Sequence, residues 1–173
     1  MQRPQYVRIT QAEWDSMKPC DRALHVARGL DGVREVGSNA GTWVGRFLAS
    51  VGLGTGFSWC AAFVYFCETT AGIALGSLPA KRKAAAVSNW YLWANKQGRI
   101  RACAKRGRLF YWLDGGQGHI GMCLSDGEAF KTLEGNTNKA GSREGDGVYD
   151  RIRTLNMLKS HELYGFIDLS DLG

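Results

Sequence analysis

The sequence is poor in proline and contains no long apolar run. Only 3 of its 173 residues are proline, and no repeat, low-complexity segment or Pro/Ser-rich linker divides the chain. The longest apolar stretch, Trp59–Cys67, is far shorter than the roughly 20 residues that a membrane-spanning helix requires. The N-terminal residues lack the apolar segment of a secretory signal. We therefore expect no membrane span, and synthesis in the cytoplasm without a signal peptide.

The cysteines follow no regular spacing. Their number is odd, and no Cys-x-x-Cys pair is present. This pattern argues against a disulfide framework and against a zinc site, and it favours folding in a reducing compartment. At least one thiol is then free for chemistry. The cysteines are Cys20, Cys60, Cys67, Cys103 and Cys123.

The composition excludes a disordered chain and a coiled coil, because 45% of the residues are hydrophobic and 22% are charged. The 22 Lys and Arg residues exceed the 16 Asp and Glu residues, and the net charge of +6 favours anionic partners. Basic residues cluster at 81–83 and 99–108, but aromatic residues are not interleaved as in proteins that bind single-stranded nucleic acid. We interpret these clusters as solvated surface and expect no nucleic-acid partner.

Helical patterns fill the first half of the chain and strand patterns the second. Thr10 and Glu13 form a capping-box pair before a short helix, which we expect Pro19 to close. Ser58 is a suitable N-cap for the clearest helix, expected to end near Ala71. Further helices are expected at 21–30, 43–51 and 91–93, and strands at 109–112, 119–124, 129–133, 148–155 and 163–169. This order predicts an α+β fold in which N-terminal helices pack on a C-terminal antiparallel sheet.

Cys60 lies at the start of the predicted helix that follows Ser58. A thiol at this position is close to free backbone N–H groups and to the positive end of the helix dipole, which favour the nucleophilic thiolate. Those N–H groups can also hold an oxyanion. The alternative is a small buried hydrophobic residue, which is the commoner role of a free cysteine. Cys67, about two turns further along the same helix, is expected to be such a core residue.

His119 begins the alternating segment GHIGMCLSDG. Strand periodicity places Ile120, Met122 and Leu124 on the core face and His119 on the other face. A histidine between small residues at the start of a strand can reach a nucleophile on a neighbouring helix. The alternative is a histidine on an exposed strand face, and we expect His25 and His161 to be structural or solvent-exposed.

The segment LEGNTN at 133–138 supplies two further candidates. Glu134 and Asn136 are two residues apart, so on a strand both side chains project from the same face. A carboxylate or amide is the group that a catalytic histidine needs to fix its tautomer. The alternative is a polar turn, because Gly-Asn-Thr-Asn is also an ordinary turn composition.

Taken together, these segments resemble the CHAP family, the cysteine, histidine-dependent amidohydrolases/peptidases of the NlpC/P60 superfamily. They occur in the family's order and cover roughly residues 20–169, so we expect a catalytic domain at 20–173 after an N-terminal appendage at 1–19. The resemblance implies a papain-like core in which the cysteine helix packs on an antiparallel sheet. The matching segments are GVREVGSNAG at 32–41, FSWCAAFVYFCETTAGI at 57–73, GHIGMCLSDG at 118–127 and TLEGNTNKAGSREGDGVYDR at 132–151.

Carried over by motif, the resemblance implies Cys60 as the nucleophile and His119 as the general base. It implies that Glu134 orients the histidine and that Asn136 supports it. The acidic calcium-binding segment of some family members is not apparent, because Asp31 is followed by Gly-Val-Arg. We therefore expect no metal or other cofactor.

The function implied is cleavage of an amide bond in peptidoglycan by a monomeric phage endolysin-like enzyme. The family cleaves either the muramoyl–L-alanine amide or a peptide bond of the stem or cross-bridge, and the sequence does not separate these. One alternative is an amidase effector injected into competitors or a virion-associated wall hydrolase. Others are acyl-group chemistry on a non-wall amide, and a non-enzymatic basic binding module whose Cys and His are structural.

Overall fold

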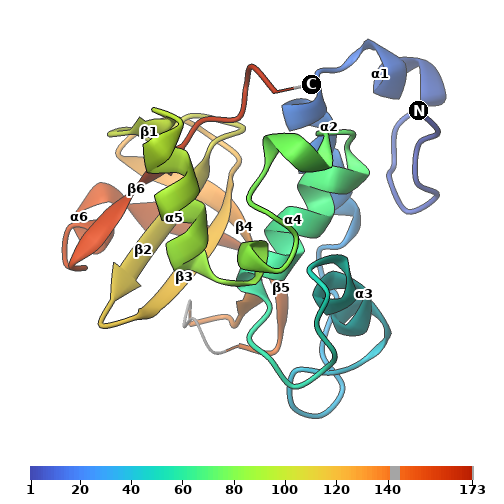
Figure 1. Ribbon diagram of the computed structural model, residues 1–173. Coiled ribbons are helices and arrows are strands. Elements are labelled where there is room, and N and C mark those ends of the chain that lie inside the picture. The colour runs from blue at the N-terminus through green and yellow to red at the C-terminus, as the bar shows by residue number, and fades with distance from the viewer. Residues whose placement is uncertain (141–144, 173) are drawn as a thin grey trace.

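A computed structural model describes residues 1–140 and 145–172 (Figure 1). Its strands form one six-stranded sheet in the order β1-β6-β2-β3-β4-β5, and every neighbouring pair is antiparallel. The strands are β1 (Ile100–Arg101), β2 (Leu109–Asp114), β3 (Gln117–Cys123), β4 (Ala129–Thr137), β5 (Gly147–Thr154) and β6 (Leu163–Ile167). The mixed helix-and-sheet architecture with an antiparallel sheet is thus confirmed.

The helices mostly precede the sheet in the chain. Figure 1 shows α2, α3 and α4 grouped on one side of the sheet and α5 lying along β2 and β3, and contacts of α4 with α2, α3, β3 and β4 make it the central helix. The helices are α1 (Gln11–Ser16), α2 (Pro19–Gly29), α3 (Thr42–Ser50), α4 (Cys60–Thr70), α5 (Val87–Lys96) and α6 (Leu155–Leu158), with 3-10 turns η1 (Leu75–Ser77) and η2 (Lys83–Ala85).

The predicted capping box is present: Thr10 accepts from the backbone of Glu13, and the Glu13 carboxylate accepts from the backbone of Thr10. The predicted role of Pro19 is wrong. Proline lacks an N–H, and the first turn of a helix does not need one, so Pro19 opens α2 instead of closing α1. The N-cap prediction for Ser58 is also wrong by one residue, because Trp59 occupies that position and caps with no side-chain hydrogen bond.

The sheet separates two hydrophobic clusters. Leu109, Ile120 and Met122 belong to the large cluster with α1–α5, whereas Phe110 and Cys123 belong to a smaller one on the opposite face. The period-2 prediction for β3 is therefore confirmed, but neither face of β3 is open to solvent. The smaller cluster, completed by Ala104, Phe130, Leu158 and Phe166, makes the face that carries His119 part of the protein interior.

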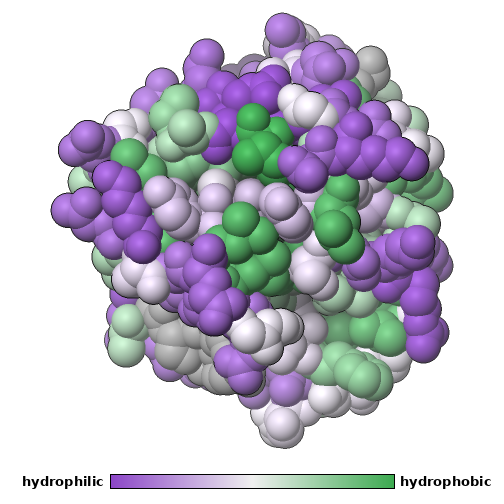
Figure 2. All heavy atoms as spheres, turned by 60° about the vertical axis from the view of Figure 1, so that its left-hand side comes forward, coloured by the Kyte–Doolittle hydropathy of each residue, from purple (hydrophilic) through white to green (hydrophobic). Residues whose placement is uncertain are grey.

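The N-terminal residues contribute to the large cluster, since Val7 and Trp14 are buried in it. No helix in the described part of the chain is long and apolar enough to cross a bilayer. On the molecular face drawn in Figure 2, hydrophobic residues form small groups separated by hydrophilic ones. The basic cluster at 99–108 is neutralised in part by ion pairs, which join Arg99 to Asp171, Arg101 and Arg108 to Asp168, and Arg106 to Asp21.

Candidate active site

Cys60 is the first residue of α4, and the bend before this helix places it beside the sheet. Trp59 has φ −123° and ψ 13°, and its carbonyl accepts the first intrahelical hydrogen bond from Phe63. The backbone N–H groups of the first turn before Phe63 donate no hydrogen bond to the Trp59 side chain. Cys60 therefore sits among the N–H groups that have no intrahelical acceptor and at the positive end of the helix dipole, as the sequence predicts.

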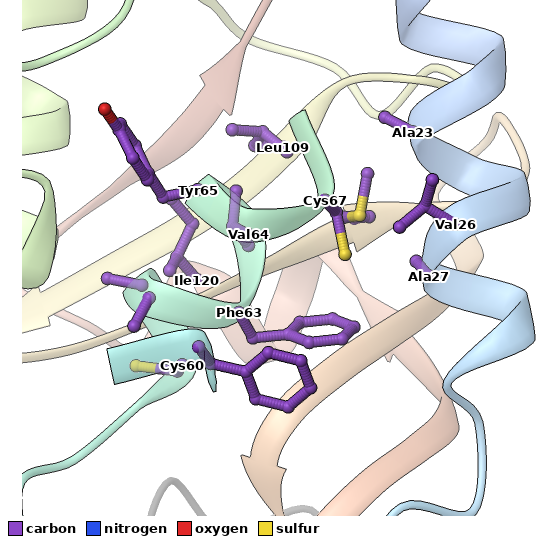
Figure 3. Packing of buried hydrophobic residues seen from close by; sticks show 14 of the residues in the cluster. Ala23, Val26, Ala27, Cys60, Phe63, Val64, Tyr65, Cys67, Leu109 and Ile120 are labelled. Carbon is purple, nitrogen blue, oxygen red and sulfur yellow. The ribbon is translucent and has the colours of Figure 1, made fainter. Parts of the chain in front are cut away.

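The two cysteines of α4 lie in different surroundings. Figure 3 shows the Cys67 side chain directed toward Val26 of α2, whereas Cys60 lies at the other end of the helix and points away from α2. Cys67 is fully buried, and burial raises the pKa of its thiol well above the ordinary value, with the nearby Glu68 acting in the same direction. The prediction that Cys67 is a core residue is confirmed.

His119 lies on β3 within reach of Cys60 and is fully buried, so the alternative of an exposed histidine is wrong. Its ring centroid is 5.9 Å from that of Phe110 and 6.1 Å from that of Trp112, both on the neighbouring strand β2. Nε2 is 2.9 Å from Oε2 of Glu134, while Nδ1 is buried without a hydrogen-bond partner among the described residues. Nδ1 is thus the ring nitrogen left to exchange a proton with the thiol.

Glu134 fixes the tautomer of His119. Burial raises the pKa of Glu134, but hydrogen bonds from Arg153 and His119 lower it to about 2. An ionised carboxylate only accepts hydrogen bonds, so Nε2 of His119 carries the proton and donates it to Oε2. Of the two candidates in the LEGNTN segment, Glu134 is therefore the one that holds the histidine ring.

The charge of His119 is set by its two neighbours. Burial lowers the pKa of His119, but its interactions with the Cys60 thiol and the Glu134 carboxylate outweigh burial and raise the pKa to about 9. An imidazole with this pKa retains a proton at neutral pH. The arrangement therefore favours a positively charged His119 beside a nucleophilic sulfur.

Asn136 lies at an irregularity of β4. The pairing register with β5 shifts between Glu134 and Thr137, and Asn136 has φ +56°, in the left-handed region that asparagine tolerates better than most residues. Asn136 is buried, with 1% of its surface exposed. The bulge interrupts the regular alternation on which the expected shared face of Glu134 and Asn136 was based.

Two glycines allow the close packing of the site. A Cβ on Gly135 would lie 2.7 Å from the Cβ of Phe63, so the absence of a side chain lets β4 approach the first turn of α4. A Cβ on Gly121 would lie 2.8 Å from Cγ of Glu134, in the space that the glutamate side chain occupies beside β3. These glycines bring the helix, the histidine strand and the glutamate strand into contact.

Arg153 and Thr132 also belong to the site, although the sequence did not indicate a role for either. Arg153 donates to both carboxylate oxygens of Glu134, from Nε to Oε1 at 2.8 Å and from Nη2 to Oε2 at 2.5 Å. The Thr132 hydroxyl donates to Oε1 at 2.5 Å. The only available indication was strand periodicity, which places Thr132 on the same face as Glu134, two residues before it.

The loop at 32–41 also reaches the start of α4. Nε1 of Trp59 donates to Oε2 of Glu35 at 3.3 Å, which anchors the loop beside the residue that precedes Cys60. An open surface cavity of about 730 Å³ adjoins this contact. Polar residues dominate its lining, which consists of Glu35, Ser38, Asn39, Asn138, Lys139, Ala140, Gly145, Asp146 and Tyr149.

Within residues 1–140 and 145–172, no three His, Cys, Asp or Glu side chains are grouped as a metal site would need. The five cysteines are free thiols. His25 is half-buried on α2, and Nδ1 of His161 pairs with Asp114 at 2.5 Å while its ring stacks on Trp112 at 4.1 Å. The chemistry available at the site is that of a thiol, an imidazole and a carboxylate.

Among the buried cysteines, Cys60 is expected to react with iodoacetamide fastest, because it begins α4 beside His119, whereas Cys67 and Cys123 lie fully buried in the hydrophobic clusters. Brief labelling of the native protein at pH 6, read out for each cysteine by mass spectrometry, measures this. Labelling in denaturant provides the control for intrinsic reactivity. Equal labelling of Cys60 and Cys67 in the native protein would contradict the assignment.

No family model matches the chain, and no match to it was found among curated proteins or solved structures. The roles of the site residues therefore depend on their geometry and on the motif resemblance.

Proposed function

We propose that the protein is a peptidoglycan hydrolase, a cysteine amidohydrolase or peptidase of the CHAP type with the papain-like arrangement of the NlpC/P60 superfamily. The observation that carries the proposal is a buried histidine placed between a helix-terminal thiol, Cys60, and a buried carboxylate, Glu134. This is the sequence of groups that nucleophilic acyl transfer requires. The order of the motifs along the chain supports the same assignment.

In the proposed reaction, the Cys60 thiolate attacks the carbonyl carbon of a wall amide and forms a C–S bond. Free N–H groups at the start of α4 are placed to stabilise the oxyanion of the tetrahedral intermediate. His119 then protonates the leaving amine through Nδ1 as the C–N bond breaks. Water, deprotonated by His119, attacks the thioester and releases the carboxylic acid and the free thiol. Glu134 holds Nε2 throughout and balances the charge of the imidazolium.

The substrate class proposed is the muramoyl–L-alanine amide or a peptide bond of the stem or cross-bridge. The polar cavity lined by Glu35 suits a peptide carrying charged groups, and Glu35 accepts a hydrogen bond from Trp59, the residue before the nucleophile. A net charge of +6 favours accumulation on an anionic wall. The setting that we propose is lysis of a bacterial host by a phage endolysin.

Digestion of purified peptidoglycan sacculi tests the proposal. Wild type is expected to release soluble fragments, whose new termini identify the bond by mass spectrometry, and Cys60→Ala is expected to release none. Cys103→Ser is the matched control, because Cys103 is an exposed free thiol remote in sequence from α4. The sacculi should include several wall chemotypes, with and without added calcium.

Absence of fragments from every wall type with wild type would contradict the proposal. Binding to sacculi that weakens steeply with salt and survives alkylation of Cys60 would then indicate the basic binding module instead. Hydrolysis of wild-type strength by Cys60→Ala would contradict the nucleophile assignment alone.

A further inference from the structure

The carboxylate of Glu134 accepts four hydrogen bonds from three side chains. Arg153 binds it through two parallel N–H groups, Thr132 donates to Oε1, and His119 donates to Oε2. A two-point bond from a guanidinium fixes the plane of a carboxylate as well as its position. The oxygen that binds the histidine therefore has a defined direction before any substrate is present.

The Arg153 side chain reaches Glu134 through the protein interior. Its backbone pairs with Phe130 on β4, four residues before Glu134, so its side chain extends along the sheet toward the carboxylate. It lies 5.8 Å from the ring centroid of Phe110, and only 7% of its surface is exposed. Burying an ion pair of this kind contributes little net stability, because the desolvation of both charges offsets their attraction. A purely stabilising role is therefore a weak explanation for its presence.

We propose that Arg153 is a positioning residue of the active site, which holds Glu134 ionised and oriented so that Oε2 binds Nε2–H of His119. The catalytic meaning of this role depends on the function proposed above. Arg153 acts on the reaction through Glu134 and His119 and does not touch the substrate. Cys60, His119, Glu134 and Arg153 thus form one series of side-chain interactions across the active site, in that order.

Without the two-point bond from Arg153, Oε2 of Glu134 is no longer held against Nε2–H of His119. The hydrogen bond that stabilises the imidazolium then weakens, and His119 becomes a weaker proton acceptor for the thiol. The other groups on this side of the sheet do not replace the guanidinium: Thr132 is neutral, burial raises the pKa of Cys123, and Arg151 donates to the backbone carbonyl of Lys139.

The test is the pH dependence of Cys60 alkylation in Arg153→Gln, with Arg151→Gln as the matched control. Arg151 is two residues away on the same face of β5 but does not bond to Glu134. We expect the alkylation profile of Arg153→Gln to move upward by about one pH unit, which makes labelling at pH 6 about tenfold slower. Arg151→Gln should keep the wild-type profile, and Arg153→Lys, which keeps the charge but loses the two-point bond, should lie between them.

A folded Arg153→Gln protein with the wild-type profile would overturn the proposal, and circular dichroism establishes whether the variant folds. If Arg153→Gln does not fold, the same measurement is made on Arg153→Lys. A wild-type pH profile of Cys60 alkylation in that variant overturns the proposal, and a profile shifted to higher pH supports it. The alkylation assay contains no wall substrate. A shifted profile in a protein that cleaves no sacculi would therefore support the positioning role and contradict only the hydrolase function.

Discussion

Replacing Glu134 by Gln is expected to lower turnover on sacculi by roughly 10²- to 10⁴-fold, the range seen when the acidic partner of a catalytic histidine loses its charge. The amide retains the size of the carboxylate, but it can present an N–H group to Nε2 and so favour the wrong tautomer of His119. It also provides no charge to stabilise the imidazolium. The turnover number, measured with the same fragment-release assay, should fall with the affinity for sacculi unchanged.

The same substitution is expected to destabilise the fold by about 3 kcal/mol, because it removes the carboxylate charge that the buried guanidinium of Arg153 binds at two points. The double variant Glu134→Gln/Arg153→Gln removes both charges and should recover much of this stability. Its turnover should stay as low as that of the single variant. Urea unfolding monitored by circular dichroism measures the stability, and Glu128→Gln on the exposed start of the β4 hairpin is the control.

Recovery of both stability and activity in the double variant would contradict the role of Glu134, because it would show that the single variant loses activity only through misfolding. The pH dependence provides a second check. The pKa of Glu134 is lowered to about 2 from its ordinary 4.5, so the stability that its ionisation provides is present above pH 4.5 and is lost as the pH falls toward 2. This acid-sensitive component should be absent from Glu134→Gln.

Local patterns predicted most of the elements of this fold. The capping box of Thr10 and Glu13, the apolar start of α4 and the alternation in β3 each depend on neighbouring residues, and each prediction is confirmed. The two-residue strand β1 and the four-residue helix α6 were missed, because they are too short to show a period. The N-cap is Trp59 and not Ser58, although serine is the better capping residue. Tertiary contacts therefore override the local preference at this position.

The site residues that lie within the sequence motifs were predictable. Those that the sheet brings in from distant parts of the chain were not. The hydrogen bond between His119 and Glu134 joins residues from two predicted strands, and the structure brings their side chains together. Arg153 belongs to a third strand, and its bond to Glu134 depends on the pairing register of β4 with β5. Nothing in the local sequence specifies that register, and the bulge near Asn136 alters it further.

The burial of Glu68 was not predictable from the sequence either, because a glutamate near the end of a helix ordinarily faces solvent. In the structure only 1% of its surface is exposed, and Oε2 has no hydrogen-bond partner among the described residues. Burial raises the pKa of Glu68 from 4.5 to about 8. The folded protein therefore keeps this carboxyl protonated under conditions in which the unfolded chain has lost the proton.

Replacing Glu68 by Gln is expected to stabilise the protein at alkaline pH. As the pH rises from 4.5 to 8, the unfolded chain releases the Glu68 proton and the folded protein retains it, so the free energy of unfolding of wild type falls. Above pH 8 both states are ionised, and this loss is complete. Its size is about 5 kcal/mol. A neutral glutamine has no such dependence, so the variant should match wild type near pH 4.5 and exceed it by about that amount at pH 9.

Urea unfolding of both proteins from pH 4.5 to 9 measures this difference. The pKa of His119 is also raised, from 6.5 to about 9, so its contribution to stability declines as the pH rises from 6.5 through 9, which overlaps the range of Glu68. That contribution is common to wild type and Glu68→Gln and cancels in their difference, which makes Glu68 the group that is measured. A difference that does not grow with pH would contradict the prediction. A difference that does grow would show that ionisation of Glu68 inside α4, the helix that carries Cys60, destabilises the wild-type fold at alkaline pH.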